Sequence, residues 1–143
     1  MIDYVIKTYE KIISKNNISI KFNKTDNFKI IGDRDKLIEI FTNLIDNSVK
    51  YSDKNKVITI TAKKDGEFNI VSVADQGIGI PKESIHRITE RFFTVDPSKS
   101  RSVGGTGLGL AIVKHLVSQH RAEMDINSVV NEGTKIDIKF NSL

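Results

Sequence analysis

The sequence contains no cysteine and no apolar run long enough to cross a membrane, and each absence narrows what the chain can be. Without cysteine it can have no disulfide framework, no thiol nucleophile and no thiolate metal site, which fits a reducing compartment. No apolar stretch approaches the roughly 18 residues of a spanning helix, and the opening residues show no signal-peptide pattern. We therefore expect this chain to be soluble, whether or not it was cut from a membrane protein.

Blocks of like charge are also missing. The net charge of +4 and the pI near 9.2 come from lysines scattered through the sequence. Nucleic-acid modules typically carry a basic patch interleaved with aromatic residues, and this chain has none. We therefore expect no nucleic-acid role, and the excess positive charge favours an anionic ligand.

The hydrophobic pattern predicts one α+β domain over residues 1–143, long enough to bury a core. Helical spacing or start signals predict helices at 2–15, 33–52, 81–91 and 107–120. β-rich composition predicts strands at 18–22, 28–31, 57–62, 68–74, 123–128 and 135–140. This order favours a mixed sheet covered on one face by helices. The segment 92–106 has no periodicity, which at that length is typical of a functional lid or a disordered loop.

The stretch from Asp33 to Ser52 is predicted to be a core helix with Asp33 as its N-cap. Asn43, Asn47 and Lys50 form a polar line along the edge of its apolar stripe, so their side chains point roughly the same way. Two amides and an ammonium on one edge can together meet a metal-bound phosphate. The alternative is an ordinary solvated flank, and the helix alone does not decide between them.

The segment from Asp75 to Ile80 places an acid at a strand end, followed by Gly77 and Gly79. Glycine lets the backbone approach a flat ligand closely or adopt positive φ. A carboxylate at the mouth of an apolar pocket can accept a hydrogen bond from an exocyclic amine, which suits adenine. The motif alone is weak, because Asp and Gly also make ordinary turns.

The glycine cluster from Gly104 to Leu110 lies where the long loop meets a helix, and the positive end of a helix favours phosphate. A P-loop is excluded because the first lysine after the cluster, Lys114, lies too deep in the helix. A dinucleotide fingerprint is excluded because a loop precedes the glycines where a strand is required.

In this order and spacing, the segments resemble the catalytic domains of sensor histidine kinases. NLIDNSVKYS is similar to the N box, DQGIGI to the G1 box, ERFF to the F box and GGTGLGLAIVKHL to the G2 box. The resemblance runs from about Asp33 to Phe140 and extends to the superfamily of gyrase, heat-shock ATPases, histidine kinases and mismatch-repair proteins. It implies a Bergerat ATP-binding fold, with ATP and Mg²⁺ held between the central helix and a mobile lid of about residues 88–106.

Matching positions imply roles for individual residues. Asn47 would coordinate Mg²⁺ through its amide oxygen, a ligand type that this cation prefers. Asn43 would support the phosphate side of the site and Lys50 would contact the phosphates, and Asp75 would accept a hydrogen bond from the adenine amine. Further nucleotide contacts are implied for Tyr51, Gly77, Gly79, Ile80, Phe92, Gly105, Thr106, Gly107, Leu108 and Gly109. Phe92 and Phe93 would anchor the lid.

One departure concerns the γ-phosphate. Many relatives have a basic residue after the second F-box aromatic, and this chain has Thr94. We expect Lys99 or Arg101 of the lid to supply that charge, so Arg101 joins Asn43 and Lys50 as a candidate catalytic residue. The three histidines have no metal-ligand spacing and are interpreted as structural or surface residues.

The resemblance implies a two-component kinase module that binds Mg-ATP and donates its γ-phosphoryl group to a histidine on a separate dimerisation domain. Through that domain, the module would have a response regulator as its further partner. The parent protein is expected to be a membrane-anchored homodimer, with this domain cytoplasmic and monomeric by itself. Because residues 2–15 contain no histidine, the chain alone should bind ATP and transfer nothing. Two alternatives stay open, a noncatalytic nucleotide-sensing or docking module and an ATP-hydrolysing conformational switch.

Overall fold

The structure, a computed structural model, describes residues 1–25, 28–52, 55–98 and 105–141. Its strands form one five-stranded sheet in the order β1-β2-β3-β5-β4. They are β1 (Ser19–Lys24), β2 (Val57–Asp65), β3 (Phe68–Ala74), β4 (Glu123–Val129) and β5 (Gly133–Asn141). β1 pairs in parallel with β2 and every other pairing is antiparallel, so the sheet is mixed.

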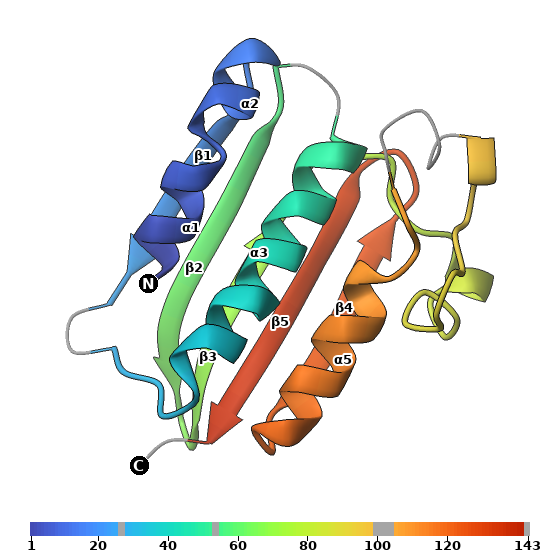
Figure 1. The fold of residues 1–143 in the computed structure, drawn as a ribbon. Helices are drawn as coiled ribbons and strands as arrows, with labels where there is room; N and C mark the ends of the chain where they lie inside the picture. Colours follow the sequence, from blue (N-terminus) through green and yellow to red (C-terminus); the bar gives the residue numbers. More distant parts are fainter. Residues whose placement is uncertain (26–27, 53–54, 99–104, 142–143) are drawn as a thin grey trace.

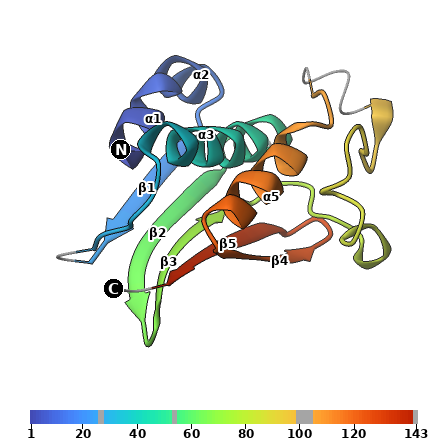
Figure 2. The ribbon, with the colours of Figure 1, turned by 60° about the horizontal axis from the view of Figure 1, so that its bottom comes forward.

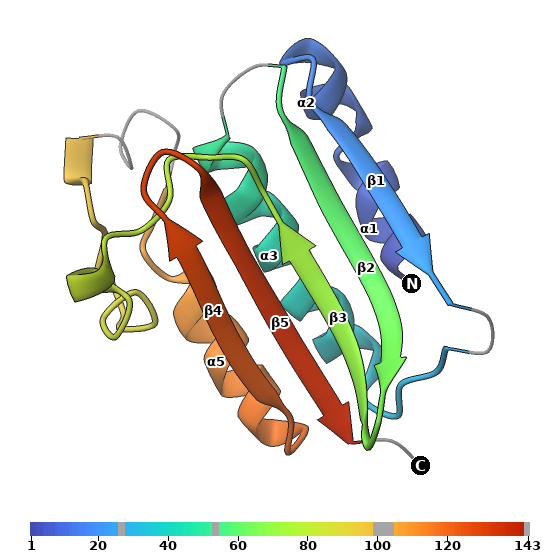
Figure 3. The same cartoon turned by 180° about the vertical axis from the view of Figure 1, so that it is seen from behind.

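The described α-helices lie on one face of this sheet (Figure 1), and the view from behind shows the strands in front of them (Figure 3). They are α1 (Ile2–Thr8), α2 (Glu10–Lys15), α3 (Arg34–Tyr51) and α5 (Gly109–Gln119). The 3₁₀ helix η1 (Lys82–Ser84) lies to the side of the sheet, past β4. Figure 2 shows α3 over the middle of the sheet, with α1 and α2 on one side and α5 on the other. The predicted α+β class is therefore confirmed.

Helix α3 forms where its apolar stripe predicts. The Asp33 side chain caps it by accepting a hydrogen bond from the Lys36 main-chain N–H, over 3.1 Å. Its buried side chains recur at helical spacing: Leu37, Ile40, Phe41, Leu44, Ile45, Ser48 and Val49. They pack on the sheet, against fully buried residues such as Ile58, Ile60 and Ile138. Removing a ring from this layer by Phe41→Ala would cost about 3–5 kcal/mol of stability. The same helix holds four predicted site residues, Asn43, Asn47, Lys50 and Tyr51, so the packing of its buried face fixes their positions.

The strand predicted at 28–31 is wrong, because these residues have no regular secondary structure. Ile31 is 68% exposed, and the Lys29 carbonyl accepts a hydrogen bond from the Asn69 side chain at 3.0 Å. β propensity is decided by packing, and this segment lacks a strand partner among the described pairings.

Two helix predictions also need correction. The helix predicted over 2–15 breaks at Tyr9, whose N–H donates to the Ile6 carbonyl in a tight turn. The helix predicted over 81–91 is only η1 followed by turns. Its main-chain hydrogen bonds, such as those from Arg87 to Ser84 and from Glu90 to Arg87, span three residues, the spacing of short 3₁₀ turns.

Candidate functional site

A cavity of about 280 Å³ lies between the C-terminal half of α3, the loop after β3 and the segment that leads into α5. Twelve of the predicted site residues line it: Asn43, Asn47, Lys50, Tyr51, Asp75, Gly79, Ile80, Gly105, Thr106, Gly107, Leu108 and Gly109. The fold thus brings together the three motifs that the sequence separates. Lys99 and Arg101 lie outside the described residues.

Asn43 faces the start of α5. Its side-chain nitrogen donates to the Glu39 carbonyl one turn earlier, at 2.9 Å, which fixes the orientation of the amide. The amide oxygen then lies beside Gly109, where an added Cβ would be 3.4 Å away. The oxygen of Asn43 is therefore presented to the cavity next to the N-terminal end of α5.

Lys50 is paired with Asp46, a cavity residue that the sequence reasoning missed. Lys50 Nζ lies 2.9 Å from Asp46 Oδ2, and the two side chains are 30% and 33% exposed. Their i, i+4 spacing is the signal that would have revealed the pair. The second carboxylate oxygen, Asp46 Oδ1, accepts a hydrogen bond from the Tyr9 hydroxyl at 3.1 Å.

Asp75 lies at the end of β3 and is held by main-chain donors. Its Oδ1 accepts from the N–H groups of Gly77, at 3.0 Å, and Thr134, at 3.1 Å. Burial raises the pKa of the Asp75 carboxyl, and hydrogen bonds from Gly77, Thr134 and Ser48 partly oppose that rise. The side chain is thus a fixed acceptor at the cavity wall. Nothing in the local sequence pointed to Thr134, since it lies on a distant strand.

The two glycines after Asp75 allow close packing of the loop. A Cβ on Gly77 would lie 2.3 Å from the Tyr51 carbonyl oxygen, and one on Gly79 would lie 2.3 Å from that of Val129. Gly79 also has φ +73, a region that favours glycine. The loop is therefore wedged between the end of α3 and the β4–β5 turn. Gly77 serves this packing and is not among the residues that line the described cavity.

The segment before α5 and the first residues of that helix line the cavity. The N-cap residue of α5, Leu108, makes no side-chain capping hydrogen bond, and Leu108, Gly109 and Leu110 line the cavity, so the positive end of the helix borders this space. The Leu108 N–H itself donates to the Thr106 hydroxyl at 3.3 Å. Gly107 has φ +74, which starts the helix at Gly109 and not at the predicted Gly107.

The structure places the two F-box aromatics differently. Phe92 has φ +65, its N–H donates to the Gly107 carbonyl at 2.8 Å, and the residue is 71% exposed. Phe93 lines the cavity and packs under the Arg87 guanidinium, 4.5 Å from the ring centroid. In the described structure this hydrogen bond ties the Phe92 backbone to Gly107, and Phe92 is not among the residues that line the cavity.

Phe93, predicted as a lid anchor, also lines the cavity. Other lining residues escaped the sequence reasoning or were given no role there: Asp46, Ile78, Ile88, Thr94, Val95, Asp96, Leu110, Ile112 and Thr134. Most are apolar and supply the walls of the cavity. Among the described residues, no cluster of three or more His, Cys, Asp or Glu side chains is arranged to hold a metal. No described helix is both long and apolar enough to cross a membrane.

The sequence profile of the histidine kinase-, DNA gyrase B- and HSP90-like ATPases matches residues 32–142, a range that includes all three motifs. The chain belongs to this ATPase family. The sensor-like histidine kinase SenX3 of Mycolicibacterium smegmatis is 34% identical over 140 residues. The phosphate regulon sensor protein PhoR of Pseudomonas aeruginosa is 42% identical over 109 residues. These alignments cover 98% and 76% of this chain but only 36% and 25% of the relatives, so the ATPase-family domain spans about a third or less of their length.

Solved structures agree with this family assignment. The catalytic domain of the histidine kinase ThkA has 27% sequence identity and a TM-score of 0.84, over 98% of this chain and 89% of that one. Full-length ShkA in complex with AMPPNP has 25% identity and a TM-score of 0.84, over 99% of this chain and 30% of that one. The predicted likeness to histidine kinase catalytic domains is thus confirmed.

Proposed function

We propose that this ATPase-family domain binds Mg-ATP and donates the γ-phosphoryl group to a histidine on a separate dimerisation domain. One observation carries the proposal: polar residues of α3, the acid after β3 and the glycine segment before α5 line a single cavity. The relatives named as sensor histidine kinases support the same activity. The ShkA complex with AMPPNP supports a nucleotide as the ligand of this fold.

Asp75 would bind the adenine end of the nucleotide. Its Oδ1 accepts from Gly77 and Thr134, and the Ser48 hydroxyl is a further donor to the carboxylate, so the adenine amine would bind at a remaining acceptor position. Gly79 would assist through water and Ile80 would pack on the base. Tyr51, in the last turn of α3, would line the adjoining part of the cleft.

The phosphates would lie between α3 and the start of α5. Asn43 and Lys50 would contact them from α3, and main-chain N–H groups of Gly105, Gly107, Leu108 and Gly109 would contact them from the opposite wall. The Leu108 N–H would exchange its bond with Thr106 for one with a phosphate. Lys99 or Arg101 would add positive charge from the lid.

The donor set fits Mg²⁺. Asn47 and Asn43 offer amide oxygens to the cavity, and Mg²⁺ prefers a few protein oxygens completed by substrate phosphates and water. The lack of a dedicated acidic cluster among the described residues is consistent with such a shared site. Asn47 would hold the ion, which when bound supplies charge compensation to the phosphates.

Phosphoryl transfer depends mainly on positioning and charge stabilisation. The neutral imidazole nitrogen of the acceptor would form a bond to the γ-phosphorus as the bond to the bridging β–γ oxygen breaks, and ADP would leave. The acceptor histidine belongs to the proposed dimerisation domain, which would pass the group to a response regulator. We further propose a homodimeric, membrane-anchored parent, with this domain in the cytoplasm and monomeric when isolated.

The experiment has two stages. Isothermal titration of the 143-residue chain with ATP and Mg²⁺ should show binding, and no heat even at millimolar ATP would contradict the proposal. The domain is then mixed with [γ-³²P]ATP and a dimerisation domain that carries the phosphoacceptor histidine. Acid-labile label should appear on that domain and be lost with Asn47→Ala, while Asn23→Ala on β1 is the matched control. Binding without transfer would favour the noncatalytic sensing or docking module.

A further inference from the structure

Two contacts connect the N-terminal helices to the cavity. The Tyr9 hydroxyl donates to Asp46 Oδ1 at 3.1 Å, and Asp46 Oδ2 lies 2.9 Å from Lys50 Nζ. Of these three described residues, only Asp46 and Lys50 line the cavity. Tyr9 reaches the pair from the break between α1 and α2, which lie beside α3 in Figure 2.

Main-chain hydrogen bonds and core packing hold Tyr9 in place. Its N–H donates to the Ile6 carbonyl at 3.0 Å, and its own carbonyl accepts from the Ile13 N–H at 2.9 Å. The ring packs against the hydrophobic core that α1 shares with α3. Burial, and secondarily the Asp46 carboxylate, raise the pKa of Tyr9 to about 12, so near neutral pH its hydroxyl is a proton donor. The N-terminal helices therefore position the hydroxyl.

Asp46 competes with phosphate for the Lys50 ammonium. The carboxylate lies one turn before Lys50 on α3, so the two charges remain neighbours as long as the helix is intact. A carboxylate that also accepts a hydroxyl hydrogen bond has part of its charge compensated and holds an ammonium less strongly. The Tyr9 bond also keeps one carboxylate oxygen turned toward the N-terminal helices.

We propose that Tyr9 is a positioning residue for the phosphate end of the nucleotide site, acting through Asp46 on Lys50. The inference rests on the proposed ATP binding. With the hydroxyl in place, Lys50 is released more easily to the phosphates. If α1 and α2 shift away from α3, Asp46 loses this donor and pairs more tightly with Lys50, and affinity for phosphate-bearing ligands falls. The N-terminal segment would thereby control nucleotide affinity.

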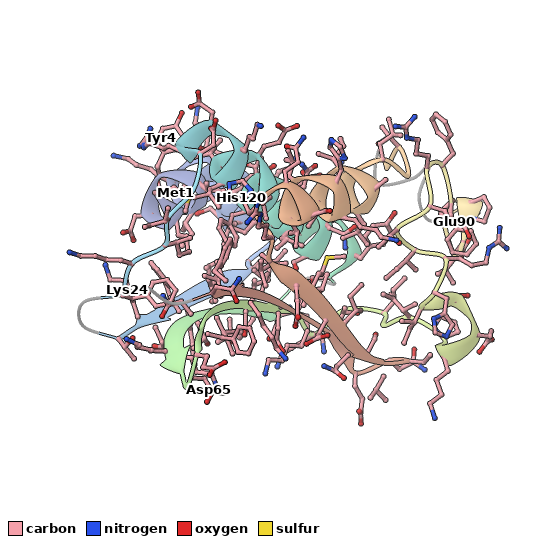
Figure 4. The ribbon with its side chains drawn as sticks, turned by 90° about the horizontal axis from the view of Figure 1, so that it is seen from below. Met1, Tyr4, Lys24, Asp65, Glu90 and His120 are labelled. Atoms are coloured by element: carbon pink, nitrogen blue, oxygen red, sulfur yellow. The ribbon has the colours of Figure 1, made fainter. Side chains whose placement is uncertain are left out.

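Tyr9→Phe tests this by removing only the hydroxyl. The dissociation constant for Mg-ATP should rise roughly three- to tenfold, the scale of one hydrogen bond, while that for adenosine stays unchanged. Tyr4→Phe is the matched control, because Tyr4 lies on the outer side of α1 and is 60% exposed (Figure 4). In an Asp46→Asn background, Tyr9→Phe should change the constant by less than about twofold.

Each outcome bears on the inference. A wild-type chain that does not bind ATP contradicts the proposed function itself. If the wild type binds but Tyr9→Phe binds ATP equally or more tightly, only the role of Tyr9 is refuted. An equal loss for ATP and adenosine would show a general loosening of the cavity, and an undiminished effect in the Asp46→Asn background would show that Tyr9 does not act through Asp46. Both of these would also overturn the inference.

Discussion

The main-chain N–H of Asp33 donates a hydrogen bond to Nε2 of His120, 3.2 Å away. The other ring nitrogen, Nδ1, lies 2.8 Å from the Leu116 carbonyl, which can only accept. The imidazole, with Nδ1 as donor to Leu116 in this arrangement, joins the C-terminal end of α5 to the N-terminal end of α3. The ring also packs edge-on against Phe140, with an interplanar angle of 86°.

The first prediction is that His120→Ala lowers the free energy of unfolding without weakening nucleotide binding. It removes both hydrogen bonds and a packed ring, and one lost hydrogen bond that leaves a partner unsatisfied costs about 1–3 kcal/mol. Urea denaturation measures the loss, and ATP titration should be unaffected because the cavity lies at the other end of α5. His86→Ala, at an exposed position, is the control. Unchanged stability would mean that His120 does not join the two helices.

The second prediction is that Asp75→Asn weakens ATP binding in a domain that remains folded. The Asn oxygen can still accept from Gly77 and Thr134, so the loop keeps its main-chain bonds. The charge-assisted bond to the adenine amine is lost, for which about 1.5–3 kcal/mol is a fair scale. Unchanged affinity would remove Asp75 from the adenine pocket, and loss of the cooperative thermal transition would assign it to the turn alone.

The pH dependence of stability gives a second readout for Asp75. Because the pKa of Asp75 is raised in the folded state, its contribution to stability is fully present below the unfolded value of 3.8 and is lost as pH rises through the folded value. Near neutral pH the buried charge is therefore unfavourable. Asp75→Asn should be at least as stable as the wild type at pH 7, with the advantage shrinking as the pH falls toward 4.

The third prediction concerns the ionisation of Tyr9. Its pKa is raised from 10.0 to about 12, so the folded state retains the phenolic proton longer than the unfolded chain. The stability that this provides is complete below pH 10 and is lost as pH rises toward 12. Subtracting the ultraviolet titration curve of Tyr9→Phe from that of the wild type isolates the ionisation of Tyr9 from that of the other two tyrosines. A difference curve with its midpoint near 10 would show that the hydroxyl is not held against Asp46.

Local patterns were sufficient to predict the central helix and most strands. The stripe from Leu37 to Ser48 predicts α3 because burial follows the helical repeat over its whole length. The strand prediction at 28–31 was wrong because β-forming residues do not indicate whether a sheet edge is available for them to pair with. The break at Tyr9 was not predicted because the apolar pattern over 2–15 is continuous, and that spacing does not encode the turn.

The site residues, like the secondary structure, were predicted where local motifs name them and missed where their role depends on contacts between distant segments. The motifs indicated the residues contributed by α3 and the two glycine segments, and the structure brings most of them to one cavity. Thr134 was invisible because its role depends on β5 pairing beside β3, which places its N–H at Asp75. The choice of Phe93 over Phe92 as a wall residue depends on the left-handed backbone at Phe92, and composition does not specify it.

The last prediction concerns hydrolysis. In the ATP-hydrolysing branches of the superfamily that this chain resembles, a glutamate that activates water commonly stands four residues before the metal-binding asparagine. Counted from Asn47, that position is Asn43 in this chain. An amide cannot accept a proton near neutral pH, and loss of a positioned general base typically costs roughly 10²- to 10⁴-fold in rate. Glu39 is exposed and is not among the described residues lining the cavity, and the Asp46 carboxylate is engaged by Tyr9 and Lys50.

We therefore expect slow ATP hydrolysis by the wild-type chain, measured as phosphate release, and a faster rate for Asn43→Glu. Asn43→Gln is the control, because it matches the longer side chain without the carboxylate. Rapid wild-type turnover that Glu39→Gln abolishes would overturn the kinase proposal in favour of an ATP-hydrolysing conformational switch. Slow hydrolysis suits a kinase, since ATP must stay intact until the acceptor histidine reaches the γ-phosphate. The amide of Asn43 cannot activate water, so it does not promote hydrolysis before that transfer.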